Sequence, residues 1–271
     1  MTRKQFLAGA SAATVAGLAS PAFAATKKPF KAALLAGRSL FGGSSASTMK
    51  TRLGADGFDM ALVDVQDSIT YPSHPEIATK NSVSPEKVSA LVCDWRKSGI
   101  EVVPLLDFCT ARDSWLGVYD RMVCSKPYDA LVRDLIRDAY AVFGSPKFIH
   151  IGFSDEGRSQ HPQGGYAVMR QGDLWMRYLA KTSSWVKETG ARTWAWFDYP
   201  WGMKDFLQDC PRDIVYSNFK SISDKRTFGR FSQVVKAGCD VIPCVRTPSD
   251  LDMAERLPQD GVLGMIKEVS V

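Results

Sequence analysis

The most constraining feature of this sequence is a regular alternation between short apolar runs and segments with helical spacing. The runs are nearly continuous in apolar residues, as is typical of parallel strands that are buried on both faces. Eight parallel strands with helical connections occupy about 250 residues in a TIM-type (β/α)₈ barrel, which is the fold we predict. The runs that predict strands lie at 31–36, 59–65, 100–107, 147–152, 192–198, 213–218, 239–245 and 262–268.

Helix-boundary residues lie between the predicted strands. Ser84 is expected to cap a helix that has Pro85 at its first position and ends at Gly99. Pro127 opens the next helix, which ends before Gly144. Only about two residues follow the last predicted strand, so we expect a minimal barrel that lacks the final helix.

An open doubly wound sheet is the alternative fold. Such sheets often carry a glycine-rich loop after the first strand, where a pyrophosphate binds. Gly42 and Gly43 stand in that region but lack the required spacing, which favours the barrel.

The N-terminal residues have the features of an export signal. Arg3 and Lys4 give a positive start, a stretch of apolar and small residues follows, and Ala22-Phe23-Ala24 forms a small-x-small cleavage site. The opening also resembles a twin-arginine export motif with lysine in the second basic place. We therefore predict a signal peptide over 1–24 and a single barrel domain over 25–271, in the periplasm or outside the cell. The apolar stretch is too short for a membrane span, and none is expected in the mature chain.

Composition excludes several classes of protein and ligand. With 45% hydrophobic and 23% charged residues, the chain has the make-up of a globular protein rather than a disordered or fibrous one. The net charge of +5 is mild and no long basic run occurs, so no nucleic-acid partner is expected. No cysteine or histidine cluster has zinc spacing, and we expect neither a metal nor a cofactor.

The six cysteines are too sparse to form the framework of the fold. In an exported chain they nevertheless permit disulfides. Cys109 and Cys124 flank a predicted surface loop and are the candidate pair, whereas Cys239 and Cys244 adjoin a predicted buried strand and are expected to be packed thiols.

Polar and aromatic residues gather at the predicted carboxyl ends of the strands, which is the face on which such barrels build their active sites. A ring of carboxylates with aromatic residues and an arginine indicates a carbohydrate site. Acids protonate a glycosidic oxygen, while flat rings pack on the apolar faces of a sugar. In chain order these residues are Arg38, Asp64, Gln66, Asp67, Asp107, Asp155, Glu156, Trp194, Trp196, Asp198, Tyr216, Asn218, Arg246, Lys267 and Glu268.

The spacing of Trp194, Trp196 and Asp198 supports this interpretation. Alternate residues of a strand share a face, so two indoles and a carboxylate would line a pocket if that face points into the barrel. The alternative is that the tryptophans only fill the barrel or pack beneath helices. Asp107 has an alternative role as well, as a cap for the helix after its strand.

The most specific signal in the chain is the segment Phe148-Ile149-His150-Ile151-Gly152-Phe153-Ser154-Asp155-Glu156. It resembles the His-Ile-Gly-Gly-Asp-Glu signature of family 20 glycoside hydrolases, the β-N-acetylhexosaminidases. The resemblance covers roughly residues 31–200, and includes Asp64-Val65-Gln66-Asp67, Gly99-Ile100-Glu101-Val102-Val103-Pro104 and Trp196-Phe197-Asp198.

The resemblance implies a retaining hydrolysis in which the substrate's own acetamido oxygen attacks the anomeric carbon. It implies that Glu156 is the general acid/base, which requires a raised pKa for its carboxyl, and that Asp155 orients the acetamido group. The implied substrate is a terminal N-acetylhexosamine of an oligosaccharide or glycan. Residues expected to bind it are Arg38, Asp67, Asp107, His150, Trp194, Trp196, Asp198, Tyr216 and Glu268.

The motif departs from that of the family at a place that matters for catalysis. Asp155 lies five residues after His150, where the family has four. Because side chains alternate along a strand, one extra residue turns the two carboxylates to the other face unless the chain bulges at Phe153-Ser154. Gln66 also stands where the family usually has glutamate, and the last strand lacks the usual tryptophan.

These observations leave the function open between two classes. The first is an exported β-N-acetylhexosaminidase, or a relative that acts on a different glycan. The second is a non-catalytic descendant that binds a glycan or a cell-wall fragment on the same face. Another barrel chemistry is also open, in which Asp67, Asp107 or Glu268 is the catalytic partner of Glu156.

Overall fold

The computed structural model describes residues 29–42, 45–154, 156–157, 168–198 and 202–270. The predicted signal peptide at 1–24 lies outside these residues, and so does Asp155 of the predicted catalytic pair. Within the described residues, no helix combines the length and the apolar character that crossing a membrane would require.

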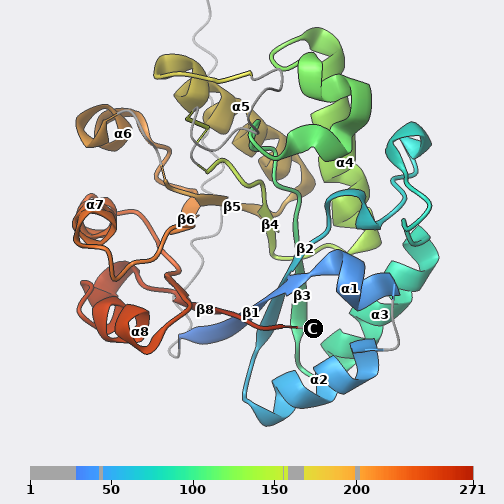
Figure 1. Ribbon diagram of the computed structural model, residues 1–271, viewed down its shortest axis with the longest axis horizontal. Coiled ribbons are helices and arrows are strands. Elements are labelled where there is room, and N and C mark those ends of the chain that lie inside the picture. Colours follow the sequence, from blue (N-terminus) through green and yellow to red (C-terminus); the bar gives the residue numbers. More distant parts are fainter. Residues whose placement is uncertain (1–28, 43–44, 155, 158–167, 199–201, 271) are drawn as a thin grey trace, which may run out of the picture.

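The described residues form eight parallel strands in one sheet (Figure 1). The strands follow one another in the order β6-β5-β4-β3-β2-β1-β8-β7, and an isolated bridge from Tyr216 to Val241 joins the two ends. This nearly closed sheet confirms the predicted (β/α)₈ barrel. The strands are β1 (Phe30–Ala36), β2 (Met60–Asp64), β3 (Glu101–Leu105), β4 (Phe148–His150), β5 (Arg192–Trp196), β6 (Val215–Ser217), β7 (Cys244–Val245) and β8 (Gly264–Glu268).

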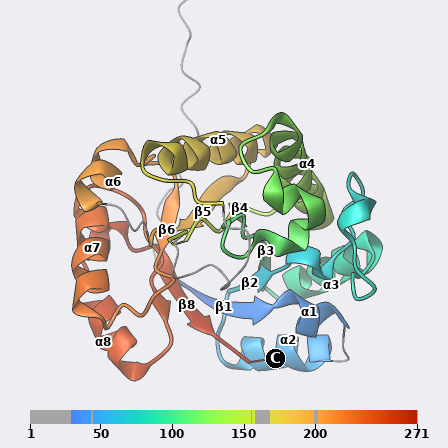
Figure 2. The same cartoon turned by 45° about the horizontal axis from the view of Figure 1, so that its top comes forward.

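Helices surround the strands on the outside (Figure 2). Two of them, α1 (Gly37–Gly42) and α2 (Ser45–Ala55), follow β1. Among the described residues, Val269 and Ser270 follow β8. In the described residues, one α-helix follows each strand from β2 to β7: α3 (Pro85–Lys97), α4 (Lys126–Val142), α5 (Asp173–Thr189), α6 (Met203–Asp209), α7 (Lys225–Lys236) and α8 (Pro248–Glu255).

The helix boundaries agree with the predicted signals. Ser84 is the N-cap residue of α3, and Pro85 is its first residue. α4 begins beside the predicted Pro127, after Ser125, whose hydroxyl accepts a hydrogen bond from the Tyr128 backbone N–H. α5 ends at Gly190, whose φ of 95° lies in the left-handed region that glycine adopts without strain.

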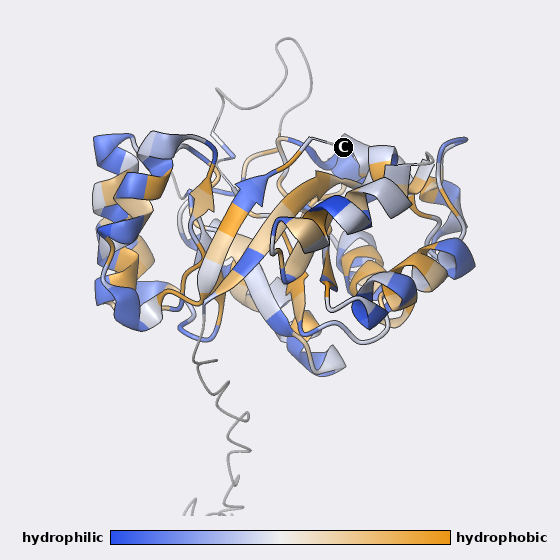
Figure 3. Cartoon of the chain, turned by 90° about the horizontal axis from the view of Figure 1, so that it is seen from below, coloured by the Kyte–Doolittle hydropathy of each residue, from blue (hydrophilic) through white to orange (hydrophobic). Residues whose placement is uncertain are grey.

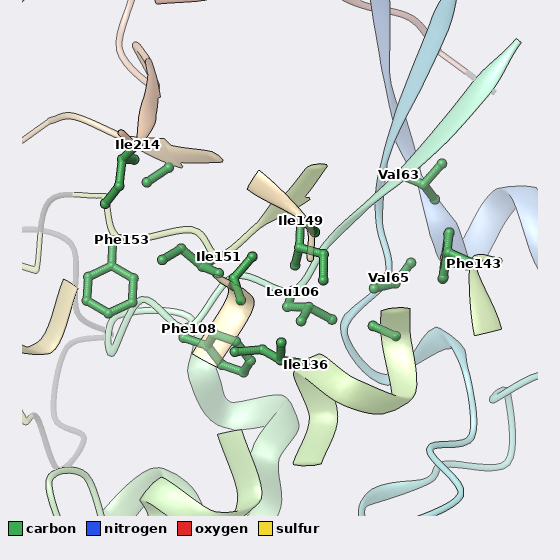
Figure 4. Packing of buried hydrophobic residues seen from close by; sticks show 14 of the residues in the cluster. Val63, Val65, Leu106, Phe108, Ile136, Phe143, Ile149, Ile151, Phe153 and Ile214 are labelled. Atoms are coloured by element: carbon green, nitrogen blue, oxygen red, sulfur yellow. The ribbon is translucent and has the colours of Figure 1, made fainter. Parts of the chain in front are cut away.

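Side chains alternate along each strand between the barrel interior and the layer beneath the helices. In β5, Trp194 and Trp196 point inward, whereas Ala195 points outward. In Figure 4, Leu106 and Phe108 of the outer layer lie beside Ile136 of α4. Figure 3 shows mostly hydrophobic strands within helices that mix hydrophilic and hydrophobic residues. The interior core consists of Ala32, Met60, Leu62, Val103, Leu105, Phe148, Trp194, Trp196, Val215, Ile242, Cys244 and Ile266.

The seam between β6 and β7 closes the barrel. Two backbone hydrogen bonds cross it, from Tyr216 N–H to the Asp240 carbonyl (3.0 Å) and from Ile242 N–H to the Tyr216 carbonyl (2.9 Å). By comparison, β1 and β2 pair over five residues in continuous register. The seam therefore has much less backbone pairing than the opposite side of the barrel.

Candidate functional site

A pocket of about 560 Å³ opens at the carboxyl ends of the strands. Its volume lies in the range that is usual for small-molecule sites. Both the strand ends and the loops that follow them contribute to the wall. The lining residues are Leu34, Leu35, Ala36, Ser39, Asp64, Gln66, Leu105, Asp107, Arg112, Trp196, Phe219, Arg246, Glu268, Val269 and Ser270.

Two aromatic rings, which we call the aromatic floor, line the pocket between two arginines. Trp196 ends β5 and Phe219 follows β6, with ring centroids 5.6 Å apart and an interplanar angle of 65°. The guanidinium carbon of Arg112 lies 4.7 Å from the Phe219 centroid, and that of Arg246 lies 5.7 Å from it. Flat apolar surface with hydrogen-bond donors beside it is well suited to a sugar ring.

Each of these arginines is paired with a carboxylate of the pocket wall. Arg112 donates from Nε and Nη2 to the two oxygens of Asp107, at 2.6 and 3.1 Å. Arg246 donates from Nε to Glu268, at 3.0 Å. Its Nη1 atom is buried and has no hydrogen-bond partner among the described residues. The pairs hold charged donors and acceptors at defined positions around the aromatic floor.

Asp64, the last residue of β2, differs from the other two acids of the pocket. Its Oδ1 atom is buried and has no hydrogen-bond partner within the described part of the chain. The Gln66 side-chain amide approaches the other oxygen at 3.4 Å, which is a weak contact. Burial, reinforced by the nearby Asp107 carboxylate, raises the pKa of Asp64 to about 7. About half of these carboxyls are therefore protonated at neutral pH.

The backbone is strained where β2, β3 and β4 end. Gln66, Asp107 and Phe153 have φ values of 34°, 47° and 64°, which side chains other than glycine adopt at a cost. Gly152 allows the ends of β3 and β4 to approach, because a Cβ atom at this position would lie 2.6 Å from the Asp107 Cα. Strain of this kind clusters at functional sites, and two of these residues, Gln66 and Asp107, line the pocket.

Glu156, the acid implied by the family resemblance, lies outside the pocket. The side chains of Glu156 and Arg170 are 0% and 1% exposed and form an ion pair, in which Arg170 Nε donates to Glu156 Oε2 at 3.0 Å. The backbone N–H of Thr110 donates to the other oxygen at 3.1 Å. Arg170 also lies over the Phe153 ring at 4.3 Å, and Phe153 belongs to the outer layer seen in Figure 4.

β4 ends at His150, before Phe153-Ser154, where a bulge would be needed to turn the two carboxylates toward the pocket. Gly152 and Phe153 both have positive φ, so the strand alternation ends there. Beyond the break, the Ser154 hydroxyl accepts a hydrogen bond from Arg112 Nη2 at 2.7 Å, on the pocket side. Glu156 instead enters the layer beneath the helices.

Trp194 and His150 lie beneath the aromatic floor, inside the barrel. Trp194 donates from Nε1 to the Ser217 hydroxyl at 2.7 Å. The His150 ring is fully buried, 4.4 Å from the Trp196 ring, and its Nδ1 accepts the Gly152 N–H. Burial holds the pKa of His150 well below its usual value, so the ring is neutral. These two residues support the aromatic floor, and neither lines the pocket.

Asp198 and Tyr216 also do not line this pocket. Asp198 is buried and accepts backbone N–H groups of Phe219 and Lys220, and thereby fixes the loop that carries Phe219. Burial raises the pKa of Asp198 to about 6. Tyr216 lies between two inward-facing residues of β6, so its own ring faces the helices, where its hydroxyl donates to the Pro211 carbonyl at 3.0 Å.

Arg38 and Asp67 form an ion pair beside the pocket. Arg38 Nη2 lies 2.7 Å from Asp67 Oδ1, and the Arg38 side chain is 62% exposed. Neither residue is among those that line the pocket. Of the residues predicted to bind substrate, the structure therefore brings Asp107, Trp196 and Glu268 together in the pocket wall.

Sequence reasoning did not select Phe219 and Arg112, and it placed Asp64 and Arg246 only among the polar residues at strand ends. Phe219 and Arg112 lie in loops, where strand periodicity does not determine the direction of a side chain. Their position directly after predicted strands was the available signal.

The comparisons with known proteins relate this geometry to one fold. No protein-family model matches the sequence, and no curated protein matches it. Among solved structures, an N-acetyl-β-hexosaminidase of Streptomyces plicatus superposes with a TM-score of 0.71 at 15% identity, over 90% of this chain and 59% of that one. A family 20 exo-β-N-acetylglucosaminidase of Vibrio harveyi gives a TM-score of 0.66 at 13% identity, over 89% of this chain and 50% of its own.

A β-N-acetylhexosaminidase of Bacteroides fragilis is similar to the same degree, with a TM-score of 0.65 at 15% identity, over 89% of this chain and 60% of that one. The present chain thus spans about half to three-fifths of the length of these solved chains. At such identities the likeness establishes the fold alone, which is a (β/α)₈ barrel similar to the barrels of these hexosaminidases.

Proposed function

We propose that this protein binds a neutral glycan in the pocket and hydrolyses a terminal N-acetylhexosamine from it. The observation that carries the proposal is the aromatic floor of Trp196 and Phe219 between two arginine–carboxylate pairs. This site lies at the carboxyl ends of the strands, where barrels of this type bind their substrates. The likeness to N-acetylhexosaminidase barrels supports the choice of sugar.

The charge of the pocket supports an uncharged ligand. Among the described lining residues, the guanidinium groups of Arg112 and Arg246 offset the carboxylates of Asp107 and Glu268. Asp64 adds little negative charge below its raised pKa of about 7. A phosphate or a carboxylate ligand would find no net positive charge here, whereas sugar hydroxyls find both donors and acceptors.

The resemblance-based mechanism assigns the chemistry to Asp155 and Glu156. The acetamido oxygen would bond to the anomeric carbon while Glu156 protonates the leaving oxygen and Asp155 orients the acetamido group. For this role, the Glu156 carboxyl has to exchange Arg170 and the Thr110 N–H for the substrate. A hydrolase proposal must therefore be tested separately from this assignment.

A second candidate function is glycan binding without hydrolysis. The burial of Glu156 in its ion pair favours this alternative specifically, because both carboxylate oxygens already accept hydrogen bonds from protein donors. The pocket itself would be unchanged, since Trp196, Phe219 and the two arginine pairs do not depend on Glu156.

The experiment measures hydrolysis and binding on the same preparation of residues 25–271. We expect release of 4-nitrophenol from its N-acetyl-β-glucosaminide or N-acetyl-β-galactosaminide, and heat of binding for N-acetylglucosamine oligomers by titration calorimetry. Binding without release on any N-acetylhexosaminide would replace the hydrolase by the binding protein. Neither release nor binding would overturn both candidates.

We also propose that the protein acts after export, with residues 1–24 removed as a signal peptide. The basic start and the Ala22-Phe23-Ala24 site support this proposal. N-terminal sequencing of protein from the periplasm or the medium should give Ala25 as the first residue. An intact N-terminus on the active protein would contradict cleavage.

A further inference from the structure

We propose that Asp64 is the proton donor of the pocket, in place of Glu156. The inference rests on the proposed glycan hydrolysis and names the carboxyl that performs its acid step. It comes from the contrast between an acid that lines the pocket without a partner for Oδ1 and an acid that is buried in an ion pair elsewhere.

The position of Asp64 in the barrel directs its carboxyl into the pocket. It pairs in register with Ala36 on β1 and with Leu105 on β3, both of which line the pocket. Residues 60 and 62 of the same strand point into the barrel interior, and Asp64 has the same parity. Because Oδ1 is shielded from solvent in the unliganded chain, a ligand completes its hydrogen bonding when the Asp64 side chain turns toward the pocket.

The surroundings of Asp64 favour its protonated form. Asp107 from the loop after β3 and Asp67 from the turn after β2 are like charges that oppose ionisation, and Arg112 and the Gln66 amide favour it. Burial is the largest effect, and the balance raises the pKa of Asp64 to about 7. Arg246 and Glu268, the remaining charged groups of the lining, are engaged with each other. A carboxyl that keeps its proton near neutral pH is what general acid catalysis requires.

The proposed step conserves atoms and charge. The Asp64 proton passes to the glycosidic oxygen as the bond between that oxygen and C1 breaks, and the electron pair of the bond stays with the oxygen. The leaving sugar departs as an alcohol and Asp64 becomes a carboxylate. The oxygen of a water molecule then bonds to C1, and one water proton returns to Asp64.

The test compares Asp64→Asn with Glu156→Gln on two substrates of different leaving-group ability. With N,N′-diacetylchitobiose, whose leaving alcohol needs a proton, we expect Asp64→Asn to lower kcat by about 100-fold or more, which is the usual size of an acid contribution. With a 2,4-dinitrophenyl glycoside, whose leaving group departs without a proton, the loss should be less than about tenfold. In the wild type, kcat should fall as pH rises through about 7, where Asp64 loses its proton.

The outcomes separate the two levels of the proposal. Equal losses on both substrates, or wild-type rates in Asp64→Asn, would overturn the role of Asp64 and leave the hydrolase intact. A leaving-group-dependent loss in Glu156→Gln instead would return the acid role to Glu156. A wild type that binds glycans and hydrolyses none would overturn the hydrolase and the proton donor together.

We also infer, from a different part of the molecule, that Cys210 and Cys239 form a disulfide across the barrel seam. Their Sγ atoms lie 3.9 Å apart, and both residues are buried. Cys210 follows α6 and precedes β6, whereas Cys239 follows α7 and precedes Val241. A bond between them would therefore tie β6 to the chain that enters β7, where the backbone pairing in the described residues is an isolated bridge.

The local chemistry favours oxidation of this pair over that of the other four thiols. Arg212 Nη1 donates to Cys239 Sγ at 3.2 Å. The pKa of Cys239 is lowered by its hydrogen bond with Cys210 and, in addition, by this guanidinium. During folding, the Cys239 thiolate attacks a small disulfide such as oxidised glutathione and displaces one thiol. Cys210 then attacks the mixed disulfide and displaces the second, so that two electrons and two protons pass to glutathione.

The test is oxidative refolding with glutathione, followed by peptide mapping without reduction. We expect a peptide pair that links Cys210 to Cys239, two hydrogen atoms lighter than the separate peptides, and a Tm several degrees higher than in dithiothreitol. Cys210→Ser and Cys239→Ser should each abolish this Tm difference, and the exposed Cys93→Ser should keep it. Two free thiols at these positions after refolding, or a link between Cys109 and Cys124 instead, would overturn the inference.

Discussion

Asp64 and Glu156 are two acids at the carboxyl end of one sheet, on β2 and after β4, yet their surroundings are opposite. Asp64 ends β2 and lines the pocket, and its Oδ1 atom has no hydrogen-bond partner in the part of the chain that the structure describes. Glu156 lies six residues beyond β4 in the outer layer, and Arg170 and the Thr110 N–H bind its carboxylate. The difference teaches that the identity of a motif residue does not determine its role here. The backbone after Gly152 determines which side of the wall the carboxyl occupies.

The largest effect that sharpens this comparison is on stability. Replacing Arg170 by Met removes the guanidinium that forms the ion pair with the buried Glu156 carboxylate, so we expect the free energy of unfolding to fall by about 3–5 kcal/mol. Urea denaturation measures the change. Asp64→Asn at pH 5 is the matched control, with a change below about 1 kcal/mol expected because Asp64 is protonated there. A loss of under about 1 kcal/mol in Arg170→Met would show that the ion pair is not formed.

The next effect is the pH dependence of unfolding. Asp64 keeps its proton up to pH about 7 in the native state, whereas an unfolded aspartate releases it near pH 4. The native state therefore holds more protons between these values, and the free energy of unfolding falls as pH rises. Asp64→Asn should reduce this fall between pH 5 and pH 8 by about 2 kcal/mol. His150 has an opposite slope, but it is present in both proteins and cancels. Parallel curves for the two proteins would contradict the raised pKa.

A smaller effect is expected for ligand binding at the aromatic floor. Phe219→Ala removes the ring that packs on Trp196 and lies beneath both arginines, so glycan affinity should fall about tenfold, or about 1.4 kcal/mol. Titration calorimetry measures it, with Phe228→Ala on α7 as a control for losing a half-buried ring outside the pocket. Equal losses in both variants would mean that the pocket is not the binding site.

The smallest effect is expected at Arg38, which the family resemblance assigns to sugar hydroxyls. Because its ion pair with Asp67 is exposed, Arg38→Ala should change the free energy of unfolding by less than about 1 kcal/mol. Glycan affinity should stay within about twofold of the wild type. A tenfold loss of affinity would extend the site beyond the described pocket wall to Arg38.

The order of strands and helices could be predicted because apolar periodicity directly reflects burial. Each of the eight predicted runs overlaps with a strand. The C-terminal ends of several runs belong to loops instead, as at Asp107 and Asp198. The pocket was less predictable. Trp196 and Glu268 follow from strand parity, whereas Phe219 and Arg112 lie in loops whose direction depends on contacts with distant residues.

Tyr216 and Glu156 illustrate why parity fails at strand ends. Tyr216 is the middle residue of a strand of three residues, so a shift by one residue decides whether its ring faces the pocket or the helix layer. Glu156 follows two residues with positive φ, and no pattern of apolar residues reports on such angles. The backbone leaves strand geometry at Gly152, but the direction of the carboxyl could be determined only from the folded chain.

Because Gln66 has a left-handed backbone conformation, a substitution here that raises thermal stability would also change the shape of the pocket. Glycine or asparagine would adopt a φ of 34° at lower cost than glutamine does. A laboratory selection for survival at high temperature, with no demand on ligand binding, should therefore exchange Gln66 early. The same exchange would remove the amide that approaches Asp64. A variant selected for thermal stability would therefore have an altered pocket wall.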